Sequence, residues 1–108
     1  MASTEEIKKI LEDLRLAIDE GKFIPINRRK NMRTLAQLGL TWEDAKDEIR
    51  LLSVKNYQKG PEIDRDRPKE DKFWIFKKKV CGEVIYIKFK VLYKVDGSLR
   101  VVSFHIDE

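Results

Sequence analysis

The chain has 108 residues, of which 42% are hydrophobic and 39% charged, a composition typical of a folded domain rather than a disordered segment. We expect a single domain over residues 1–108. No apolar run approaches the length of a membrane span, and the single cysteine excludes an internal disulfide. These features predict a cytoplasmic protein without a membrane partner.

The net charge of +4 is unevenly distributed. Acidic and basic residues balance in residues 1–71, so the whole positive excess lies in residues 72–108. A basic C-terminal third favours an anionic partner such as nucleic acid or an acidic protein, although net charge alone does not distinguish the two.

Three helices are predicted in the region of about residues 4–52. Ser3 and Glu6 form a capping-box pattern, after which apolar residues recur at helical spacing. Residues 31–38 predict a second, short helix, and Thr41 is the expected cap of a third. Each predicted helix has an apolar stripe that must pack against something else.

The segments between and after the helices have less regular patterns. The stretch KFIPI could form a short strand, but Pro25 would restrict it to a sheet edge. The basic run Asn27–Arg33 is interpreted as a solvated connection, with contact to phosphate or a partner as the alternative. Residues 56–72 contain two prolines and follow no period, which predicts an unstructured connection that is either a solvated linker or a functional lid.

An alternation of period two begins at Phe73 and continues almost to the end of the chain. It predicts strands at about 73–80, 83–93 and 99–106, with turns at Cys81-Gly82 and Asp96-Gly97. We therefore expect an α+β fold in which the N-terminal helices pack on one face of a twisted, three-stranded antiparallel sheet.

The register of the last predicted hairpin follows from its turn. A two-residue turn at Asp96-Gly97 sets three apolar pairs on one face: Val91 with Val102, Phe89 with Phe104, and Ile87 with Ile106. A slip of one residue would move all of them to the other face, which supports this register. On the polar face it predicts Lys88 opposite His105, Lys90 opposite Ser103, and Tyr86 opposite Asp107. In the preceding hairpin, Lys77 is expected opposite Tyr86.

The polar face of the predicted sheet is rich in lysine and in groups that transfer protons: Lys77, Lys79, Tyr86, Lys88, Lys90, Ser103 and His105. One interpretation is a solvent-exposed face whose lysines discourage aggregation. The other is a phosphate-binding surface on which His105, the only histidine, transfers a proton. One histidine and one cysteine do not complete an ordinary zinc site, and no nucleotide-binding glycine loop is present, so we expect no metal and no cofactor.

Several segments together resemble the MqsR-family toxins from about Gly21 to the end of the chain: LGLTWEDAKDEI, NYQKG, a Trp-bearing strand, GEVIYIKFKV and VVSFHIDE. The resemblance implies a RelE-like fold and a toxin of a bacterial type II toxin–antitoxin pair. Its activity would be metal-independent, sequence-selective cleavage of mRNA by an endoribonuclease. The implied partners are mRNA, a cognate antitoxin and the ribosome.

The resemblance also implies site residues. The family's loop lysine falls on Lys59 and its strand tyrosine on Tyr86, while His105 replaces a lysine near the end of the best-known member. We thus expect Lys59, Tyr86 and His105 to be catalytic, and four further residues to bind RNA or phosphate: Lys77, Lys88, Lys90 and Ser103. A family glutamine falls on Ile75, so the cleavage preference does not transfer. The alternative is a non-catalytic RNA- or protein-binding module that uses the same basic face.

Overall fold

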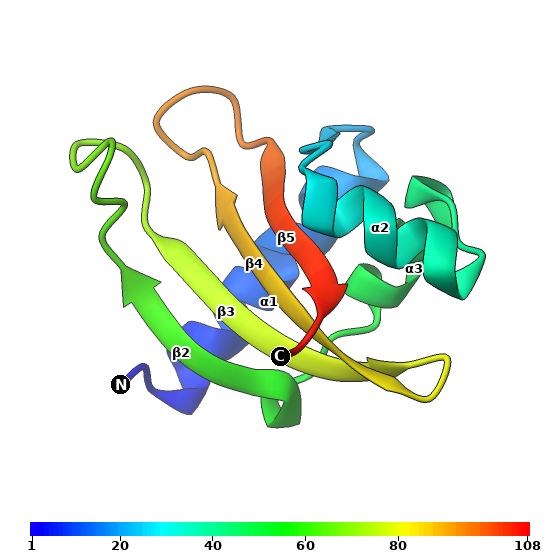
Figure 1. Cartoon of the computed structure of the whole chain (residues 1–108). Helices are drawn as coiled ribbons and strands as arrows, with labels where there is room; N and C mark the ends of the chain where they lie inside the picture. The colour runs from blue at the N-terminus through cyan, green and yellow to red at the C-terminus, as the bar shows by residue number, and fades with distance from the viewer.

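The computed structural model describes residues 1–108 and confirms the α+β class. Three helices are present: α1 (Thr4–Asp19), α2 (Arg29–Leu38) and α3 (Trp42–Arg50). Five strands form one sheet in the order β1-β5-β4-β3-β2 (Figure 1): β1 (Phe23–Pro25), β2 (Tyr57–Glu62), β3 (Phe73–Val80), β4 (Glu83–Val91) and β5 (Leu99–Ile106).

Local capping signals set the starts of α1 and α3 and the end of α2 as predicted. The start of α2 differs, because the helix begins at Arg29 without a side-chain cap and includes most of the basic run that was interpreted as a connection. The Ser3 hydroxyl accepts a hydrogen bond from the Glu6 amide at 3.1 Å, and the Glu6 carboxylate accepts one from the Ser3 amide at 3.0 Å. Thr41 caps α3 through the amide of Asp44 at 3.1 Å. Gly39 ends α2 with φ of 68°, a left-handed conformation in which glycine has no Cβ penalty.

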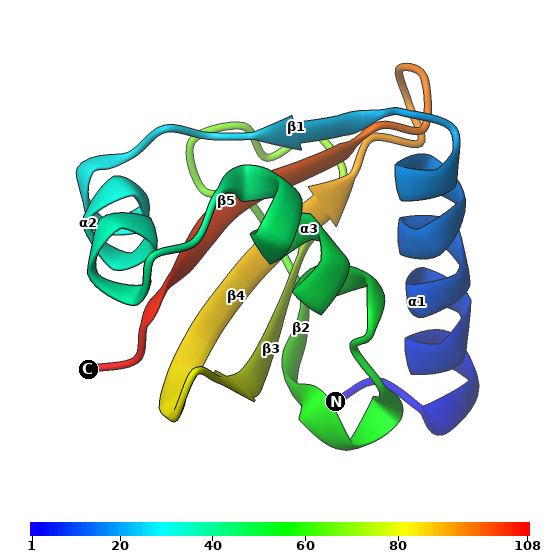
Figure 2. The same ribbon diagram turned by 90° about the vertical axis from the view of Figure 1, so that its right-hand side faces the viewer.

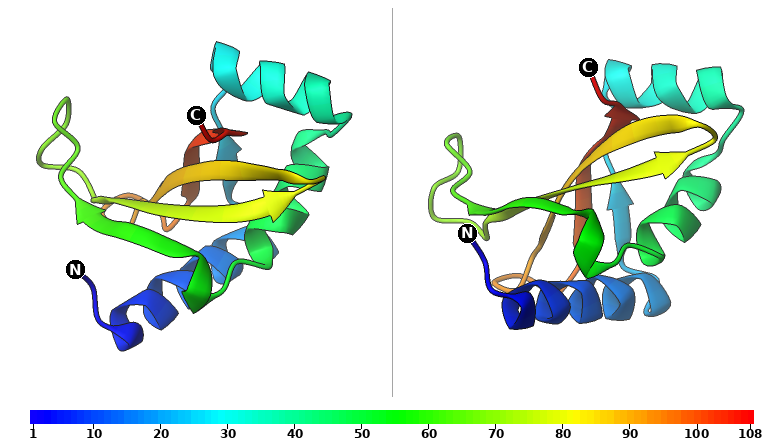
Figure 3. Two further views of the ribbon diagram at one scale, coloured as in Figure 1. Left: turned by 60° about the horizontal axis from the view of Figure 1, so that its bottom comes forward. Right: turned by 90° about the horizontal axis from the view of Figure 1, so that it is seen from below.

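The hydrophobic core lies between the sheet and the two helices α1 and α3, which cover one of its faces (Figures 1 and 2). Leu14 of α1 and Ile49 of α3 are fully buried against the aromatic residues of the central strands. Phe76 and Phe89 stack there with ring centroids 5.6 Å apart. The opposite face of the sheet is therefore left for polar side chains. Figure 3 shows α1 and α2 at opposite ends of the strand array, with α3 between them.

The sheet has two more strands than predicted and is mixed rather than antiparallel. The edge position expected for Pro25 is confirmed, because β1 pairs in parallel with β5. The prediction of an unstructured segment over 56–72 was wrong for its first part, which forms β2 and leaves residues 63–72 as the loop. Two register shifts interrupt the pairing of β2 with β3, so β2 lacks the regular alternation that would have revealed it.

The pairing of β3 with β4 follows the predicted register, including Lys77 opposite Tyr86. The predicted register of β4 with β5 was wrong, because the chain turns over residues 92–98 instead of at Asp96-Gly97 alone. The carbonyl of Leu92 accepts the amides of residues 95, 96 and 97, which closes a wider turn. The observed polar pairs are Tyr86 with His105, Lys88 with Ser103, and Lys90 with Arg100.

A β-bulge explains why His105 nevertheless lies on the predicted face. The pairing shifts by one residue between Lys88 and Phe89, opposite Val102. The shift restores the expected alternation for the last residues of β5, so Phe104 is buried in the core and His105 faces the other way. The residues of β5 that precede the bulge face opposite to the prediction. Arg100 therefore lies on the polar face beside Lys90.

Side chains of α2 complete the edge of β5 beyond the end of β1. The Asn31 amide nitrogen donates to the carbonyls of Ile26 and Val102 at 2.9 Å each, and its oxygen accepts from the Phe104 amide at 2.9 Å. The Thr34 hydroxyl accepts from the Ile106 amide at 3.0 Å. These bonds replace a neighbouring strand and hold the segment that carries His105.

Candidate functional site

Tyr86 and His105 lie side by side on the polar face. Their rings stack with centroids 5.3 Å apart and an interplanar angle of 21°, and both side chains are half-buried. Lys77 is the neighbour of Tyr86 on β3, and its ammonium lies 2.9 Å from a carboxylate oxygen of Asp107. The structure thus brings three of the predicted site residues into one row across β3, β4 and β5.

The hydrogen bonding of His105 indicates which of its ring nitrogens is free. Nδ1 lies 3.0 Å from the carbonyl oxygen of Ile106, which can only accept. Nδ1 therefore carries the proton in the neutral ring, and Nε2 keeps its lone pair. No protein group hydrogen-bonds Nε2. This atom can accept a proton from a bound molecule, or donate one when the ring is charged.

A groove of about 910 Å³ lies next to this row, between the sheet, the segment that follows β1, and the loop 63–72. Lys59 and Lys88 both line it. The Lys59 side chain is 61% exposed and lies 3.5 Å from Glu62. The Lys88 ammonium lies 4.5 Å from the centroid of the Phe73 ring and makes no ion pair. The groove is thus a second basic region on the same face.

The position of Lys59 depends on the glycine that follows it. Gly60 has φ of 123°, and a Cβ at this position would lie 2.8 Å from the carbonyl oxygen of Phe73. Only glycine allows this close approach of β2 to β3 without displacing backbone. The NYQKG motif therefore has a structural reason for its glycine beside the candidate lysine.

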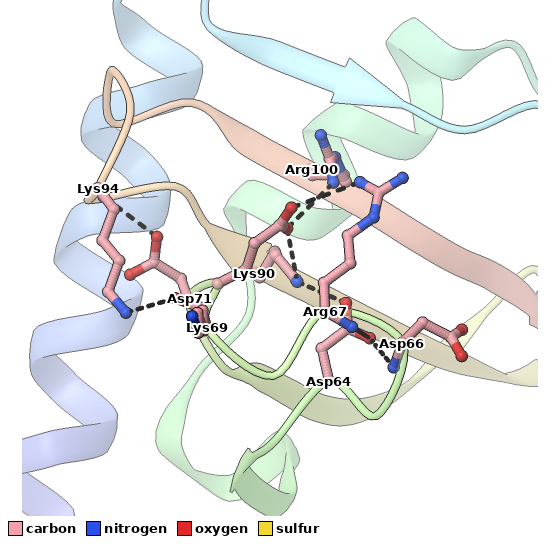
Figure 4. Close-up of polar contacts among 9 residues, drawn as sticks. Asp64, Asp66, Arg67, Lys69, Asp71, Lys90, Lys94 and Arg100 are labelled. Carbon is pink, nitrogen blue, oxygen red and sulfur yellow. Dashed lines mark hydrogen bonds and ion pairs between the residues drawn. The ribbon is translucent and has the colours of Figure 1, made fainter.

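Lys90 is fully buried and is occupied by the loop. Its ammonium lies 2.7 Å from Asp64 (Figure 4) and 3.2 Å from Glu70. It also lies 4.3 Å from the centroid of the Phe73 ring. Two carboxylates and an aromatic face compensate the cost of burying this charge. In this arrangement Lys90 fastens the loop 63–72 to the sheet and is not accessible to a phosphate.

Ser103 is also buried, with 3% of its surface exposed, and it accepts a hydrogen bond from a neighbouring cation. Its hydroxyl lies 3.2 Å from a guanidinium nitrogen of Arg28, which also approaches the Val102 carbonyl at 3.5 Å. Arg28 lines the groove together with Arg100 of β5. Arg65 and Arg67 of the loop line it as well, so the groove contains four arginines that were not among the predicted site residues.

Comparison with known proteins identifies the family of this chain. A family model described as "Motility quorum-sensing regulator, toxin of MqsA" matches residues 7–106. The chain belongs to this toxin family. No curated protein and no solved structure matches the chain, and the RelE-like detail of the fold stays a prediction.

Membership of the MqsR toxin family makes this chain a toxin of a toxin–antitoxin system, with a cognate antitoxin as its partner. No helix of the toxin combines the length and the hydrophobicity needed to cross a membrane. No group of three or more His, Cys, Asp or Glu side chains is placed to hold a metal ion.

Arg28 and Arg100 of the candidate site had different signals in the sequence. Arg28 belongs to the basic run Asn27–Arg33, for which phosphate contact was the alternative interpretation. Arg100 has the parity of Val102 and Phe104, so it occupied an expected core position in the predicted register. A charge at such a position is itself a sign of an irregularity, and the bulge at Val102 is that irregularity.

The toxin's loop should detach from the sheet at acidic pH. Hydrogen bonds from the Lys90 ammonium lower the pKa of Asp64 and of Glu70. A pKa that is lower in the docked loop favours docking above the carboxyls' ordinary pKa values, and this contribution is lost as the pH falls through the lowered values. We expect the amide NMR signals of residues 63–72 to change as the pH falls below about 4, before the signals of the central strands.

A pair of variants tests the cause of this effect. Lys90→Met removes the buried ammonium, so the carboxyl carbons of Asp64 and Glu70 should titrate at higher pH than in the wild type. Lys94→Met is the control, because the Lys94 ammonium contacts the loop only at the Lys69 carbonyl, at 2.7 Å (Figure 4). Equal carboxyl titration curves in the wild type and Lys90→Met would contradict the assignment.

Proposed function

We propose that this toxin is an endoribonuclease that cleaves mRNA in the cytoplasm without a metal ion. The observation that carries the proposal is the Tyr86–His105 stack, which sets two proton-transfer groups side by side on a basic face. Family membership supports the same function, since it establishes a toxin.

The proposed reaction uses the ribose hydroxyl of the RNA as the nucleophile. A base removes the 2′-OH proton, the 2′-oxygen forms a bond to the adjacent phosphorus, and the bond from phosphorus to the 5′-oxygen breaks. An acid gives a proton to the departing 5′-oxygen. His105, through Nε2, and the Tyr86 hydroxyl are the two proton-transfer groups that we propose. Lys77 lies beside Tyr86, and although its ammonium is paired with Asp107 at 2.9 Å, its side chain is partly exposed, unlike that of Lys90, and can offset negative charge on the phosphate.

The lysines of the groove would bind the RNA strand next to the reacting phosphate. Lys88 makes no ion pair, and the Lys59 ammonium lies 3.5 Å from Glu62 on an exposed side chain, so both can reach a phosphate. Lys90 has a different role in this proposal, because its charge is already neutralised by Asp64 and Glu70. Ser103 would act through Arg28 rather than by touching RNA.

The products of cleavage test this mechanism. Purified toxin incubated with RNA and an excess of chelator should cleave it, and should leave a 2′,3′-cyclic phosphate and a 5′-hydroxyl, because the 2′-oxygen is the nucleophile. Enzymatic mapping of the new ends and their sequence context is the measurement. Cleavage of free RNA would also show that the ribosome is not required.

Two results would contradict the proposal in different ways. Cleavage that stops in chelator and returns only with a divalent ion would exclude the metal-free mechanism. RNA binding without any cleavage, on free RNA and on translating ribosomes, would instead favour a non-catalytic module that uses the basic face.

A further inference from the structure

The cations around the groove differ in whether a carboxylate neutralises them. Four of them have such a partner within 4 Å: Lys59 with Glu62, Lys90 with Asp64 and Glu70, Arg67 with Glu70, and Arg100 with Glu70. Arg28, Arg65 and Lys88 line the same groove and have none. Arg65 is an exposed residue of the loop, whereas Arg28 bonds to Ser103 and Lys88 pairs with Ser103 across the strands. Their charges are uncompensated on a surface where most other basic side chains are paired, so this part of the groove suits an anion.

Arg28 also has hydrogen bonds to neutral groups of β5. One guanidinium nitrogen donates to the Ser103 hydroxyl at 3.2 Å and approaches the Val102 carbonyl at 3.5 Å. The other donors of its planar fork have no protein partner, and this fork matches phosphate geometry. Because Ser103 pairs with Lys88 across the strands, Arg28 contacts β5 at the position opposite this lysine.

The spacing relates this cation pair to the proposed reaction centre. Lys88 follows Tyr86 by two residues on β4, and Ser103 precedes His105 by two residues on β5. Positions two apart on one face of a strand are separated by about 6.8 Å. This separation is comparable to that of successive phosphates in a single-stranded RNA.

From these observations we infer that Arg28 and Lys88 form a binding site for the RNA phosphate next to the scissile one, with Ser103 as the residue that positions Arg28. The inference rests on the proposed function. Arg28 is a binding residue and takes no part in proton transfer, so it sets the position of the strand relative to Tyr86 and His105.

Binding of a non-cleavable RNA tests the site directly. The probe is a fluorescent, fully 2′-O-methylated oligonucleotide of mixed sequence, which has phosphates but no 2′-hydroxyl to attack. Arg28→Ala should weaken its binding about tenfold, the effect of losing one charge-assisted contact. It should also lower the slope of log affinity against log salt by about 0.7, the value for one phosphate contact on a single strand. In cleavage assays, KM should rise while kcat changes little.

Three companion variants complete the test, with thermal melting to verify that each is folded. Arg33→Ala makes the same charge change on an exposed residue of α2 that does not line the groove, and should bind like the wild type. Arg28→Lys should give an intermediate affinity, since it keeps the charge but not the planar fork. Ser103→Ala should weaken binding in the same direction as Arg28→Ala.

The outcomes separate this inference from the proposed function. A wild-type protein that never cleaves RNA, but binds it through Arg28, would refute the nuclease and leave the phosphate site intact. Equal affinities and salt slopes for the wild type, Arg28→Ala and Arg33→Ala would overturn the site, even if the wild type cleaves RNA. A wild type that does not bind the probe would overturn it as well.

Discussion

Replacement of His105 with alanine is expected to lower single-turnover RNA cleavage by about 10²–10⁴-fold, the usual contribution of a positioned proton donor or acceptor. Stability should change little, because the ring is half-buried and lies outside the hydrophobic core. Affinity for the methylated RNA should fall far less than the cleavage rate, since the unpaired cations of the groove remain. Thermal melting, RNA affinity and cleavage should be measured on the same preparation.

A second substitution separates proton transfer from support of Tyr86. His105→Phe keeps an aromatic ring against Tyr86 but removes both nitrogens, so it should be as defective in cleavage as His105→Ala. Lys8→Ala is the surface control, because Lys8 is an exposed residue of α1, the helix that covers the opposite face of the sheet, and makes no ion pair. If His105→Phe cleaves RNA like the wild type, the imidazole only packs against Tyr86 and the proton-transfer role is wrong.

Replacement of Asn31 with alanine should have the largest effect on folding among polar substitutions near the site. It removes the hydrogen bonds at the carbonyls of Ile26 and Val102 and leaves the Phe104 amide buried without a partner. We expect the free energy of unfolding to fall by about 3 kcal/mol. For a domain of this size, the melting temperature should fall by roughly 12–24 °C. Chemical and thermal denaturation are the measurements.

The matched control for this substitution lies on the same helix. Gln37→Ala also removes an amide from α2, but Gln37 is exposed and forms no hydrogen bond with the protein. It should leave stability within about 0.5 kcal/mol of the wild type. Alanine has a higher helix propensity than asparagine or glutamine, so helix propensity alone would stabilise the Asn31→Ala variant rather than destabilise it. Equal stability of the two variants would show that the Asn31 hydrogen bonds do not hold β5.

Features that depend on neighbouring residues were predictable from the sequence alone. The capping residues Ser3 and Thr41 mark the starts of α1 and α3, and the limits of β3 and β5 follow from alternation. The hairpin at Cys81-Gly82 has the predicted register, because both turn residues adopt positive φ in a two-residue turn that leaves little freedom. Family membership followed from segments that are likewise local in the chain.

Tertiary contacts decided the composition of the site. Lys88 and Lys90 have equivalent positions in the sequence pattern, yet two carboxylates of the loop bury Lys90 while Lys88 keeps its charge uncompensated. Arg28 lies on this face because it donates a hydrogen bond to Ser103, which is more than seventy residues away in the sequence. A bulge opposite Lys88 and Phe89 determines which residues of β5 face the groove. Such pairings depend on distances between segments remote in sequence, and alternation along one strand carries no information about them.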